Sequence, residues 1–407
     1  MSKVIIIGGG PAGMMAAITA SNDHEVILLE KNEKLGKKLF ITGKGRCNVT
    51  NGKDIGEFFQ YIPTNPHFLY SALYTFTNED VIRFFEDRGV RLKRERGDRV
   101  FPESDKSSDI IKALDNELKN RNVKVILGAS VKALEIKDDI VTGVILEDGK
   151  KILGDHFILC TGGLSYPQTG STGEGLKFAR NLGHNIIDPK PSLVPIEIEE
   201  SWAKELQGLS LKNIELTIKN KNSKKVFKEQ GEMLFTHFGI SGPLVLSGSS
   251  AVKKDGPYTV EINLKPALSE GELDKRVQGD FNLYLNKDFK NALNDLFPKK
   301  LIPIMIQLSG IDENQKINTI TKEQRKKFVT LIQNLKLTVK ALRPVAEAIV
   351  TAGGVDTKEI DPSTMKSKIT PNLSFAGEVI DVDAYTGGYN VQIALSTGYL
   401  AGNKIGE

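Results

Sequence analysis

The first 30 residues alternate between short apolar runs and a stretch with helical spacing. Residues 4–7 form a β-branched run that predicts a fully buried parallel strand, and residues 14–18 predict a helix. A second apolar run at 25–29 predicts the next strand. Between the first strand and the helix lies GGGPAG at 8–13, which has the spacing GxGxxG. The pattern therefore predicts a β-α-β unit with a glycine-rich turn.

Each glycine of this spacing has its own use in a dinucleotide-binding site. Gly8 permits the tight turn, Gly10 lets the backbone approach a pyrophosphate, and Gly13 lets the helix pack closely on the strand. The start of the helix adds unpaired N–H groups and a partial positive charge. Glu30 ends the second strand and can accept hydrogen bonds from an adenosine ribose, which disfavours a 2′-phosphate. We predict FAD or NAD here rather than NADP; the alternative is a glycine turn that binds nothing.

Two later junctions between a strand and glycines predict further contacts to the same ligand. One is a strand over 155–160 that ends in Thr-Gly-Gly, and Thr172 is expected to cap the helix that follows. The other is a strand over 372–376 that ends in Gly-Glu, before a final helix that opens at Gly387 and Gly388. Amides at a helix start can stabilise negative charge on a reduced ring. Both ends of the chain are therefore expected to build one site.

The stretch GKGRCNVTN at 43–51 allows three interpretations: a phosphate cradle, a redox centre or a tight loop. No segment has the Walker spacing GxxxxGK[ST], which excludes an ATP-binding P-loop. Cys47 has no cysteine two residues away, which excludes a disulfide-reductase dithiol. We expect Cys47 to pack as a small buried residue; the alternative is a reactive thiol activated by Arg46. Arg46 itself is expected near phosphate or ring oxygens.

The middle of the chain predicts a different kind of structure. Residues 188–192, DPKPS, are typical of a linker. After them, residues 193–198, 214–218 and 258–264 alternate like the strands of a small β-domain. From 269 to about 336 the apolar spacing becomes helical.

Composition and charge exclude several classes of protein. A chain of 407 residues with 40% hydrophobic and 26% charged residues is expected to fold into two or three domains. The formal charge of +4 is weak support for nucleic acid, and the basic run at 219–228 predicts a solvated hairpin tip, with an RNA or anionic-substrate patch as the alternative. Two cysteines supply neither a disulfide framework nor a metal site. No apolar run is long enough for a membrane span, so we expect a soluble, cytoplasmic protein.

Five blocks of the sequence, in order, resemble one known family. They are GGGPAG with Glu30, GKGRCNVTN, GGLSYPQTGSTGEG, LFTHFGISGP at 234–243 and FAGEVIDVDAYTGGYNVQ. The chain is similar in these blocks to the BaiN/RdsA-type NAD(P)/FAD-dependent oxidoreductases, also called aminoacetone-oxidase-family FAD-binding enzymes. The resemblance implies an α/β fold: a glutathione-reductase-like FAD-binding Rossmann domain with an inserted β-barrel domain that carries a helical insertion. The expected segments are 1–190 and 367–407 for the FAD domain, 191–267 and 337–366 for the barrel, and 268–336 for the helical insertion.

The resemblance also implies where FAD lies. The backbone of Val131 is expected to meet the adenine, and the ribityl contact stays open between Glu378 and Asp381. The complete set of expected cofactor-binding residues is Gly8, Gly10, Pro11, Ala12, Gly13, Glu30, Lys31, Lys37, Lys38, Gly43, Gly45, Arg46, Cys47, Asn48, Val131, Thr161, Gly162, Gly163, Thr172, Gly173, Gly377, Glu378, Asp381, Gly387, Gly388, Tyr389, Asn390, Val391 and Gln392.

Three residues are candidates for catalysis: His237, Tyr385 and Arg46. A lone histidine among apolar neighbours is usually structural, and the alternative for His237 is a proton donor at the flavin face. Tyr385 lies beside a cofactor motif and either packs against the ring or handles protons. No metal is expected.

These predictions lead to one main function and several alternatives. The main one is an FAD-dependent oxidoreductase that transfers a hydride between NAD(P)H or an organic donor and a small-molecule acceptor. No second GxGxxG follows a strand, so NADH or NADPH would visit the flavin transiently. The alternatives are an amine oxidase that uses O2, a flavin-dependent RNA-modifying or RNA-binding protein, and a non-catalytic flavin sensor. Nucleic acid is not the expected partner, and the oligomeric state stays open.

Overall fold

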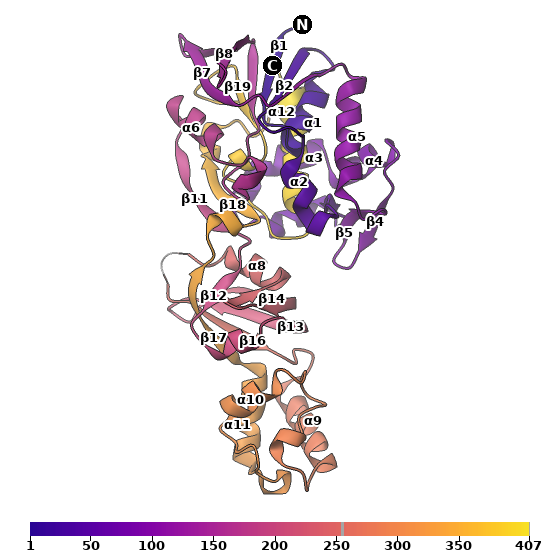
Figure 1. The fold of residues 1–407 in the computed structure, drawn as a ribbon, viewed down its shortest axis with the longest axis vertical. Helices are drawn as coiled ribbons and strands as arrows, with labels where there is room; N and C mark the ends of the chain where they lie inside the picture. Colours follow the sequence, from indigo (N-terminus) through magenta and orange to yellow (C-terminus); the bar gives the residue numbers. More distant parts are fainter. Residues whose placement is uncertain (254–255, 407) are drawn as a thin grey trace. The chain divides into compact units, whose positions relative to one another are not determined.

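The computed structural model describes residues 1–253 and 256–406, and it divides into two units (Figure 1). Unit 1 comprises Met1–Ser192 and Pro344–Glu407, and unit 2 comprises Leu193–Arg343. Each unit is built around its own apolar core. Two segments distant in the sequence therefore make one unit, while the other unit is continuous.

A five-stranded parallel sheet is the centre of unit 1. Its strand order is β19-β10-β1-β2-β6, and every neighbouring pair is parallel. The strands are β1 (Lys3–Ile7), β2 (Glu25–Glu30), β6 (Lys124–Leu127), β10 (His156–Leu159) and β19 (Leu373–Phe375). β1 lies in the middle, paired with β10 on one side and with β2 on the other, and its residues Val4, Ile5 and Ile6 are fully buried. The strands expected from the apolar runs at both ends of the chain are therefore present in one sheet.

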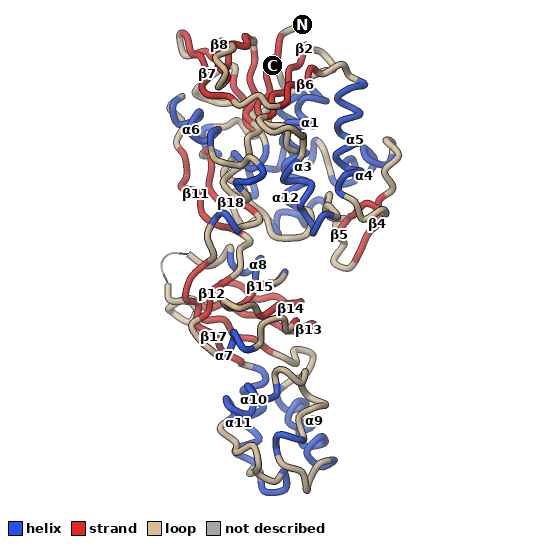
Figure 2. Tube along the Cα trace, viewed as in Figure 1, coloured by secondary structure: helices blue, strands red, loops and turns tan. Residues whose placement is uncertain are grey.

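Two helices from opposite ends of the sequence pack tightly against each other in unit 1. They are α1 (Pro11–Ala20) and α12 (Tyr389–Asn403). A Cβ atom added at Gly398 would lie 2.3 Å from the Ala12 carbonyl oxygen, and one at Gly402 would lie 2.4 Å from that of Ala16. Only glycine permits this approach of the two backbones. Helix α5 (Ser107–Asn120) also contacts α1 (Figure 2).

The rest of unit 1 consists of short helices and small sheets. The helices are α2 (Lys37–Ile41), α3 (Tyr70–Thr75), α4 (Asn78–Glu86) and α6 (Glu174–Asn181). One antiparallel sheet contains β3 (Thr50–Asn51), β5 (Arg99–Pro102) and β4 (Leu92–Glu95); another contains β7 (Val131–Lys137), β8 (Ile140–Leu146) and β9 (Lys151–Leu153). A third pairs β11 (Ile186–Ser192) with β18 (Val350–Val355).

The interpretation of residues 188–192 as a linker is wrong. These residues lie in β11, which pairs antiparallel with β18. Pro189 and Pro191 are tolerated because β11 has only one neighbouring strand and its register shifts between Ile187 and Lys190.

Unit 2 contains a closed six-stranded barrel and several helices, which lie in the sequence between the barrel strands. The strand order is β12-β15-β14-β13-β16-β17. The strands are β12 (Ile196–Ile198), β13 (Ser210–Lys219), β14 (Lys225–Phe235), β15 (Gly239–Ser241), β16 (Thr259–Asn263) and β17 (Leu335–Leu342), and α7 (Trp202–Glu205) and α8 (Pro243–Ser249) lie between them in the sequence. The last barrel strand ends at Leu342. Residues 344–366, which we expected in the barrel, belong instead to unit 1.

Three helices lie between β16 and β17: α9 (Glu270–Leu283), α10 (Ile302–Ser309) and α11 (Lys322–Gln333). Both α9 and α11 begin with a capping box, Ser269 with Glu272 and Thr321 with Gln324. Their apolar faces share one core with the barrel. Their assignment as a separate domain therefore stays a prediction. No helix in the described residues is both long and apolar enough to cross a membrane.

Candidate flavin site

The glycine turn after β1 has the geometry of a phosphate cradle. Gly8 has φ +109°, and a Cβ added there would lie 2.4 Å from the Cys160 carbonyl oxygen. A Cβ at Gly13 would lie 1.9 Å from the Gly8 oxygen. A Cβ at Gly10, in contrast, would meet no atom within 4 Å. Packing explains Gly8 and Gly13, while Gly10 faces open space at the uncapped N-terminus of α1, where a pyrophosphate would fit.

Glu30 is buried beside this turn and is already hydrogen-bonded. Its Oε2 accepts from the Gly9 N–H (2.7 Å), and its Oε1 accepts from the Asn32 backbone N–H (2.8 Å) and from Asn32 Nδ2 (2.6 Å). A carboxylate offers about four acceptor positions, so one remains for a ribose hydroxyl. Glu30 therefore both fixes the turn and keeps capacity for a ligand.

The Thr161 hydroxyl is a buried polar group on the turn that follows β10. Thr161 follows β10, and its Cα lies 3.1 Å from the Cβ position of Gly8. Its Oγ1 is buried and has no hydrogen-bond partner in the described residues. A buried hydroxyl without a partner is costly. The oxygen itself lies against Gly175 of α6, where an added Cβ would be 1.9 Å from it, so a ligand partner would have to reach the space between this turn and the start of α6.

Lys31 and the end of β2 connect to the segment before α6. Lys31 Nζ donates to Thr172 Oγ1 (2.6 Å) and to Glu174 (2.8 Å). The expectation that Thr172 caps α6 is wrong: the N-cap is Gly173, with φ +82° and no side-chain cap. The left-handed glycine lets the chain turn into the helix, and the Thr172 hydroxyl serves Lys31 instead. Lys37 Nζ donates to Asn32 Oδ1 (3.2 Å), on the ribose side of the cradle.

The GKGRC stretch is a tight left-handed loop. Gly43, Lys44, Gly45 and Cys47 have φ of +57°, +60°, +84° and +59°. Cys47 is fully buried, and burial raises the pKa of its thiol to about 12. The thiol therefore stays neutral, and the reactive-thiol alternative gains no support. Cys160 is buried too.

Arg46 does not lie free beside the cradle. Its Nε donates to Asp105 Oδ1 (2.8 Å), its Nη2 pairs with Glu95, and its guanidinium lies 4.1 Å from the centre of the Phe101 ring. Two carboxylates thus compensate its charge and raise its pKa. In this arrangement Arg46 stabilises the loop rather than facing a cofactor.

The residue Asn48 joins the loop to the C-terminal helix. With its amide oriented to satisfy both ends, its nitrogen donates to the carbonyls of Val100 (3.1 Å) and Thr50 (3.0 Å), and its oxygen accepts from the Gly388 N–H (2.9 Å). A Cβ at Gly388 would lie 2.2 Å from the Thr50 oxygen. The start of α12 is therefore fixed against this loop, as the interpretation of one shared site requires.

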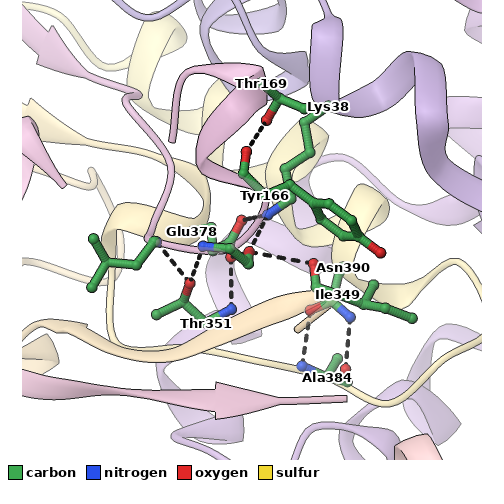
Figure 3. Close-up of polar contacts among 10 residues, drawn as sticks. Lys38, Tyr166, Thr169, Ile349, Thr351, Glu378, Ala384 and Asn390 are labelled. Atoms are coloured by element: carbon green, nitrogen blue, oxygen red, sulfur yellow. Dashed lines mark hydrogen bonds and ion pairs between the residues drawn. The ribbon is translucent and has the colours of Figure 1, made fainter. Parts of the chain in front are cut away.

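The side chains at the start of α12 mostly hold the fold together. Tyr389 is buried between Tyr61 (ring centroids 4.7 Å apart) and Phe58 (4.9 Å). Asn390 exchanges two hydrogen bonds with the Ala384 backbone (Figure 3). Gln392 is fully buried and accepts from Thr50 Oγ1 at 2.6 Å. The side chains of Tyr389 and Gln392 are thus engaged by the fold, and the cofactor contacts expected from this segment stay a prediction.

A network around Glu378 joins four segments of unit 1 (Figure 3). Glu378 Oε2 accepts from Lys38 Nζ (2.5 Å), and its Oε1 accepts from the Thr351 N–H (2.7 Å) and from Ser165 Oγ (2.9 Å). Lys38 Nζ also donates to Ser165 Oγ (2.6 Å). Ser165 and Thr351 were missed in the sequence. Ser165 follows Gly163 and Leu164 closely enough to be found, but nothing in the local pattern marks Thr351.

The other candidate for the ribityl contact, Asp381, is also buried. Asn65 Nδ2 donates to its Oδ2 (2.9 Å), and burial raises its pKa despite this bond. Two residues on, Asp383 is 1% exposed and accepts from Ser192 Oγ (2.6 Å), but its Oδ1 has no partner in the described residues. Burial raises the pKa of Asp383 as well. The choice between Glu378 and Asp381 stays open.

The remaining expected residues lie in both units. Val131 is buried at the start of β7, directly after a segment whose Ala129 N–H donates to the Glu30 carbonyl (2.9 Å). Tyr385 is half-buried, and its N–H donates to the Tyr61 carbonyl (2.8 Å). His237 belongs to unit 2, in the exposed turn between β14 and β15, against Phe238. It is thus exposed rather than buried, and its role as a proton donor stays a prediction.

The chain matches the family model described as HI0933-like protein Rossmann domain over residues 2–404. The chain belongs to the HI0933-like family of flavoprotein oxidoreductases. These are the BaiN/RdsA-type FAD-dependent enzymes that the five sequence blocks resemble, so that prediction is confirmed.

The similarity to two curated relatives extends over almost the whole length of both this chain and each relative. A 3-dehydro-bile acid delta(4,6)-reductase from Clostridium scindens is 33% identical over 420 residues, covering 100% of both chains. A ribosomal RNA dihydrouridine synthase from Haemophilus influenzae is 34% identical over 402 residues, covering 98% of this chain and 97% of the relative. Among solved structures, a 3-ketosteroid delta1-dehydrogenase from Sterolibacterium denitrificans superposes with a TM-score of 0.52 at 13% identity, covering 99% of this chain and 98% of that one. This last likeness concerns the fold alone.

Proposed function

We propose that this protein is an FAD-dependent reductase that saturates a carbon–carbon double bond conjugated to a carbonyl, with NADH or NADPH as the hydride source. One observation carries the proposal: two full-length relatives with unlike substrates are named for the same chemical change. A delta(4,6)-reductase of a 3-dehydro steroid and a dihydrouridine synthase both imply addition of a hydride and a proton to an alkene next to a carbonyl. We propose a small molecule as the acceptor.

The residues of unit 1 would bind and orient the cofactor. Free N–H groups at the start of α1 would hold the pyrophosphate, and Glu30 would accept from a ribose hydroxyl. The Thr161 hydroxyl would gain the partner it lacks among the described residues. Amides at the start of α12 would face the ring. Bound FAD would supply the capacity to accept and donate a hydride.

The proton for the second half of the reaction needs a donor. We propose Tyr385, because it is half-buried three residues before Gly388, at the start of α12. His237 is the second candidate, and Arg46 is not proposed because two carboxylates occupy it. Replacing a proton donor typically lowers the rate about 10²–10⁴-fold. Tyr385→Phe should lower the rate of the oxidative half-reaction and leave reduction of the flavin by NAD(P)H unchanged.

The proposal is tested with anaerobic mixing of the yellow holoprotein. NADH or NADPH should bleach the flavin, and a 3-oxo-Δ4 steroid or a uracil-containing RNA should then restore the colour without O2. Aminoacetone serves as the competing donor. If the flavin is instead bleached by aminoacetone and not by NADH or NADPH, with O2 consumed on turnover, the result would overturn the reductase proposal in favour of an amine oxidase.

A second candidate substrate is uracil within RNA, favoured by the basic hairpin of unit 2. The basic run at 219–228 comprises the turn at 220–224 that connects β13 to β14 and the strand ends beside it. Lys219 and Lys228 pair with Glu261 (2.6 Å) and Glu215 (3.1 Å). The lysines at the tip itself are exposed; they are Lys221, Lys224 and Lys225. Unit 2 carries 24 lysines and arginines against 18 acidic residues, so it attracts polyanions more than unit 1 does.

A further inference from the structure

The Lys38 side chain has one hydrogen-bond donor left over. An ammonium group carries three N–H donors. One goes to Glu378 Oε2 (2.5 Å) and one to Ser165 Oγ (2.6 Å). The side chain is 21% exposed, so solvent or a ligand can reach part of it. Lys38 is thus oriented by two fixed acceptors and still has one donor to give.

Glu378 fixes the position of Lys38 in this pair. Both of its oxygens are already engaged, by Lys38 on one side and by the Thr351 N–H and Ser165 Oγ on the other. These partners come from β18 and from the segment after β10, so they keep the carboxylate in place. A fixed carboxylate in turn fixes the ammonium of Lys38, and it offsets part of its charge.

The pair lies beside the cradle at the carboxyl edge of the sheet. The Gly36 N–H, at the start of α2, donates to the Gly9 carbonyl (2.9 Å). Gly377, directly before Glu378, packs on the first turn of α1: a Cβ there would lie 2.9 Å from the Ala12 Cβ. Ligands of open parallel sheets bind outside this edge. Lys38 therefore presents a positive charge to the ligand region from the side where the two halves of unit 1 meet.

We propose that Lys38 tunes the redox potential of the bound flavin, by giving its third N–H to the isoalloxazine end of FAD. The inference rests on the proposed binding of FAD. When NAD(P)H is oxidised to NAD(P)⁺, the hydride adds one negative charge to the ring system. A fixed ammonium stabilises that charge, so it strengthens binding of the reduced cofactor more than of the oxidised one. Glu378 moderates the effect.

The experiment compares wild-type holoprotein with Lys38→Met, Lys38→Arg, Glu378→Gln and the matched control Lys34→Met. Lys34 is an exposed lysine of the same segment. Two quantities are measured for each: the Kd of oxidised FAD and the midpoint potential against a reference dye. In K38M the preference for reduced over oxidised FAD should fall about tenfold, which lowers the potential by about 30 mV for a two-electron couple. K38R and K34M should keep the wild-type potential.

Each remaining outcome decides the matter. If K38M binds oxidised and reduced FAD more weakly by the same factor, the potential stays unchanged. Lys38 would then hold the phosphates or stabilise the fold, and this result would overturn the inference. If K38M does not fold, E378Q keeps the lysine and removes its counter-charge, and it must raise the potential; an unchanged value overturns the idea. Wild-type protein that binds no FAD would sink the proposed function, whereas a yellow K38M with the wild-type potential sinks only this inference.

Discussion

Units 1 and 2 differ in how completely their polar interiors are satisfied. Among the described residues, three buried side-chain atoms lack a hydrogen-bond partner: Thr161 Oγ1, Asp383 Oδ1 and Arg88 Nε, and all lie in unit 1. The described residues of unit 2 contain none. Two of the three atoms lie in the segments that we expect to surround the cofactor. Within the described residues, the buried polar side chains of unit 2 are thus satisfied by the protein itself, whereas unit 1 contains polar atoms for which we propose a ligand partner.

The largest effect should come from the glycines that pack the cradle. Gly13→Ala would place a Cβ 1.9 Å from the Gly8 oxygen, so it should destabilise unit 1 by about 3 kcal/mol and abolish FAD binding. Gly10→Ala is the matched control, because its Cβ meets no protein atom within 4 Å. It should keep the wild-type Tm and weaken FAD binding about tenfold or more, or about 1.4 kcal/mol. Thermal denaturation and FAD titration measure both. Equal loss of stability in the two variants would contradict the packing assigned to Gly13.

Thr161→Val tests whether the unpaired buried hydroxyl of unit 1 serves the ligand or the fold. Without ligand, the variant removes a buried hydroxyl that lacks a partner among the described residues, so the apoprotein should be as stable as the wild type or about 1 kcal/mol more stable. FAD binding should weaken about fivefold to tenfold, since a hydrogen bond to the ligand contributes about 1 kcal/mol. Denaturant unfolding of the apoprotein measures the change in stability, and FAD titration measures the change in affinity. A less stable apoprotein would show that the hydroxyl serves the fold and not the ligand.

Asp383 gives a pH test of the same contrast. Burial raises its pKa in the folded state. The folded protein therefore holds the proton more tightly, and the stability from this group is present below the unfolded pKa of about 3.9 and is lost as pH rises through the folded value. Asp383→Asn should raise the stability of the apoprotein at pH 7 by about 1 kcal/mol. The gain should vanish near pH 3, as measured by urea denaturation. A gain that persists at pH 3 would contradict the raised pKa.

The smallest effect on unit 1 should come from the hairpin of unit 2. Replacing Lys221, Lys224 and Lys225 with glutamine should change stability by less than about 0.5 kcal/mol. FAD affinity should also stay at the wild-type value. If RNA is the substrate, the slope of log K against log salt should become shallower by about 0.7 for each phosphate that these lysines neutralise in the wild type. Filter binding of RNA fragments at several salt concentrations measures this. Wild-type protein that binds no RNA at low salt would remove uracil in RNA as a substrate.

The sequence predicted best where structure depends on local patterns. The apolar run of β1, the glycine turn and the acid at Glu30 all lie within 30 residues, and the structure contains the strand, the turn and a hydrogen bond from the Gly9 N–H to Glu30. Arg46 could not be placed, because its partners Glu95 and Asp105 are 49 and 59 residues away. The same limit hid the partner of Lys38, Glu378, 340 residues further on. Ion pairs across such distances follow from the topology of the sheet, which no local spacing records.

Prolines misled the interpretation of 188–192 for a related reason. Two prolines in five residues usually mark a connection, and only the pairing of β11 with β18, some 160 residues later, shows that they lie in a strand. The resemblance to a known family supplied the discontinuous order of the segments. It could not specify which side chains bind a ligand and which, like Tyr389 and Gln392, are engaged by the fold.

The close crossing of α1 and α12 has a consequence for biosynthesis. Unit 2 is a continuous stretch, so it can fold as soon as residues 193–343 have left the ribosome. The nucleotide cradle waits longer, because an edge strand of its sheet and the helix against α1 come from residues 373–403. The first part of unit 1, residues 1–192, leaves the ribosome some 150 residues before its second part begins at Pro344. We therefore expect FAD to bind late in biosynthesis, after the two sequence segments of unit 1 have come together.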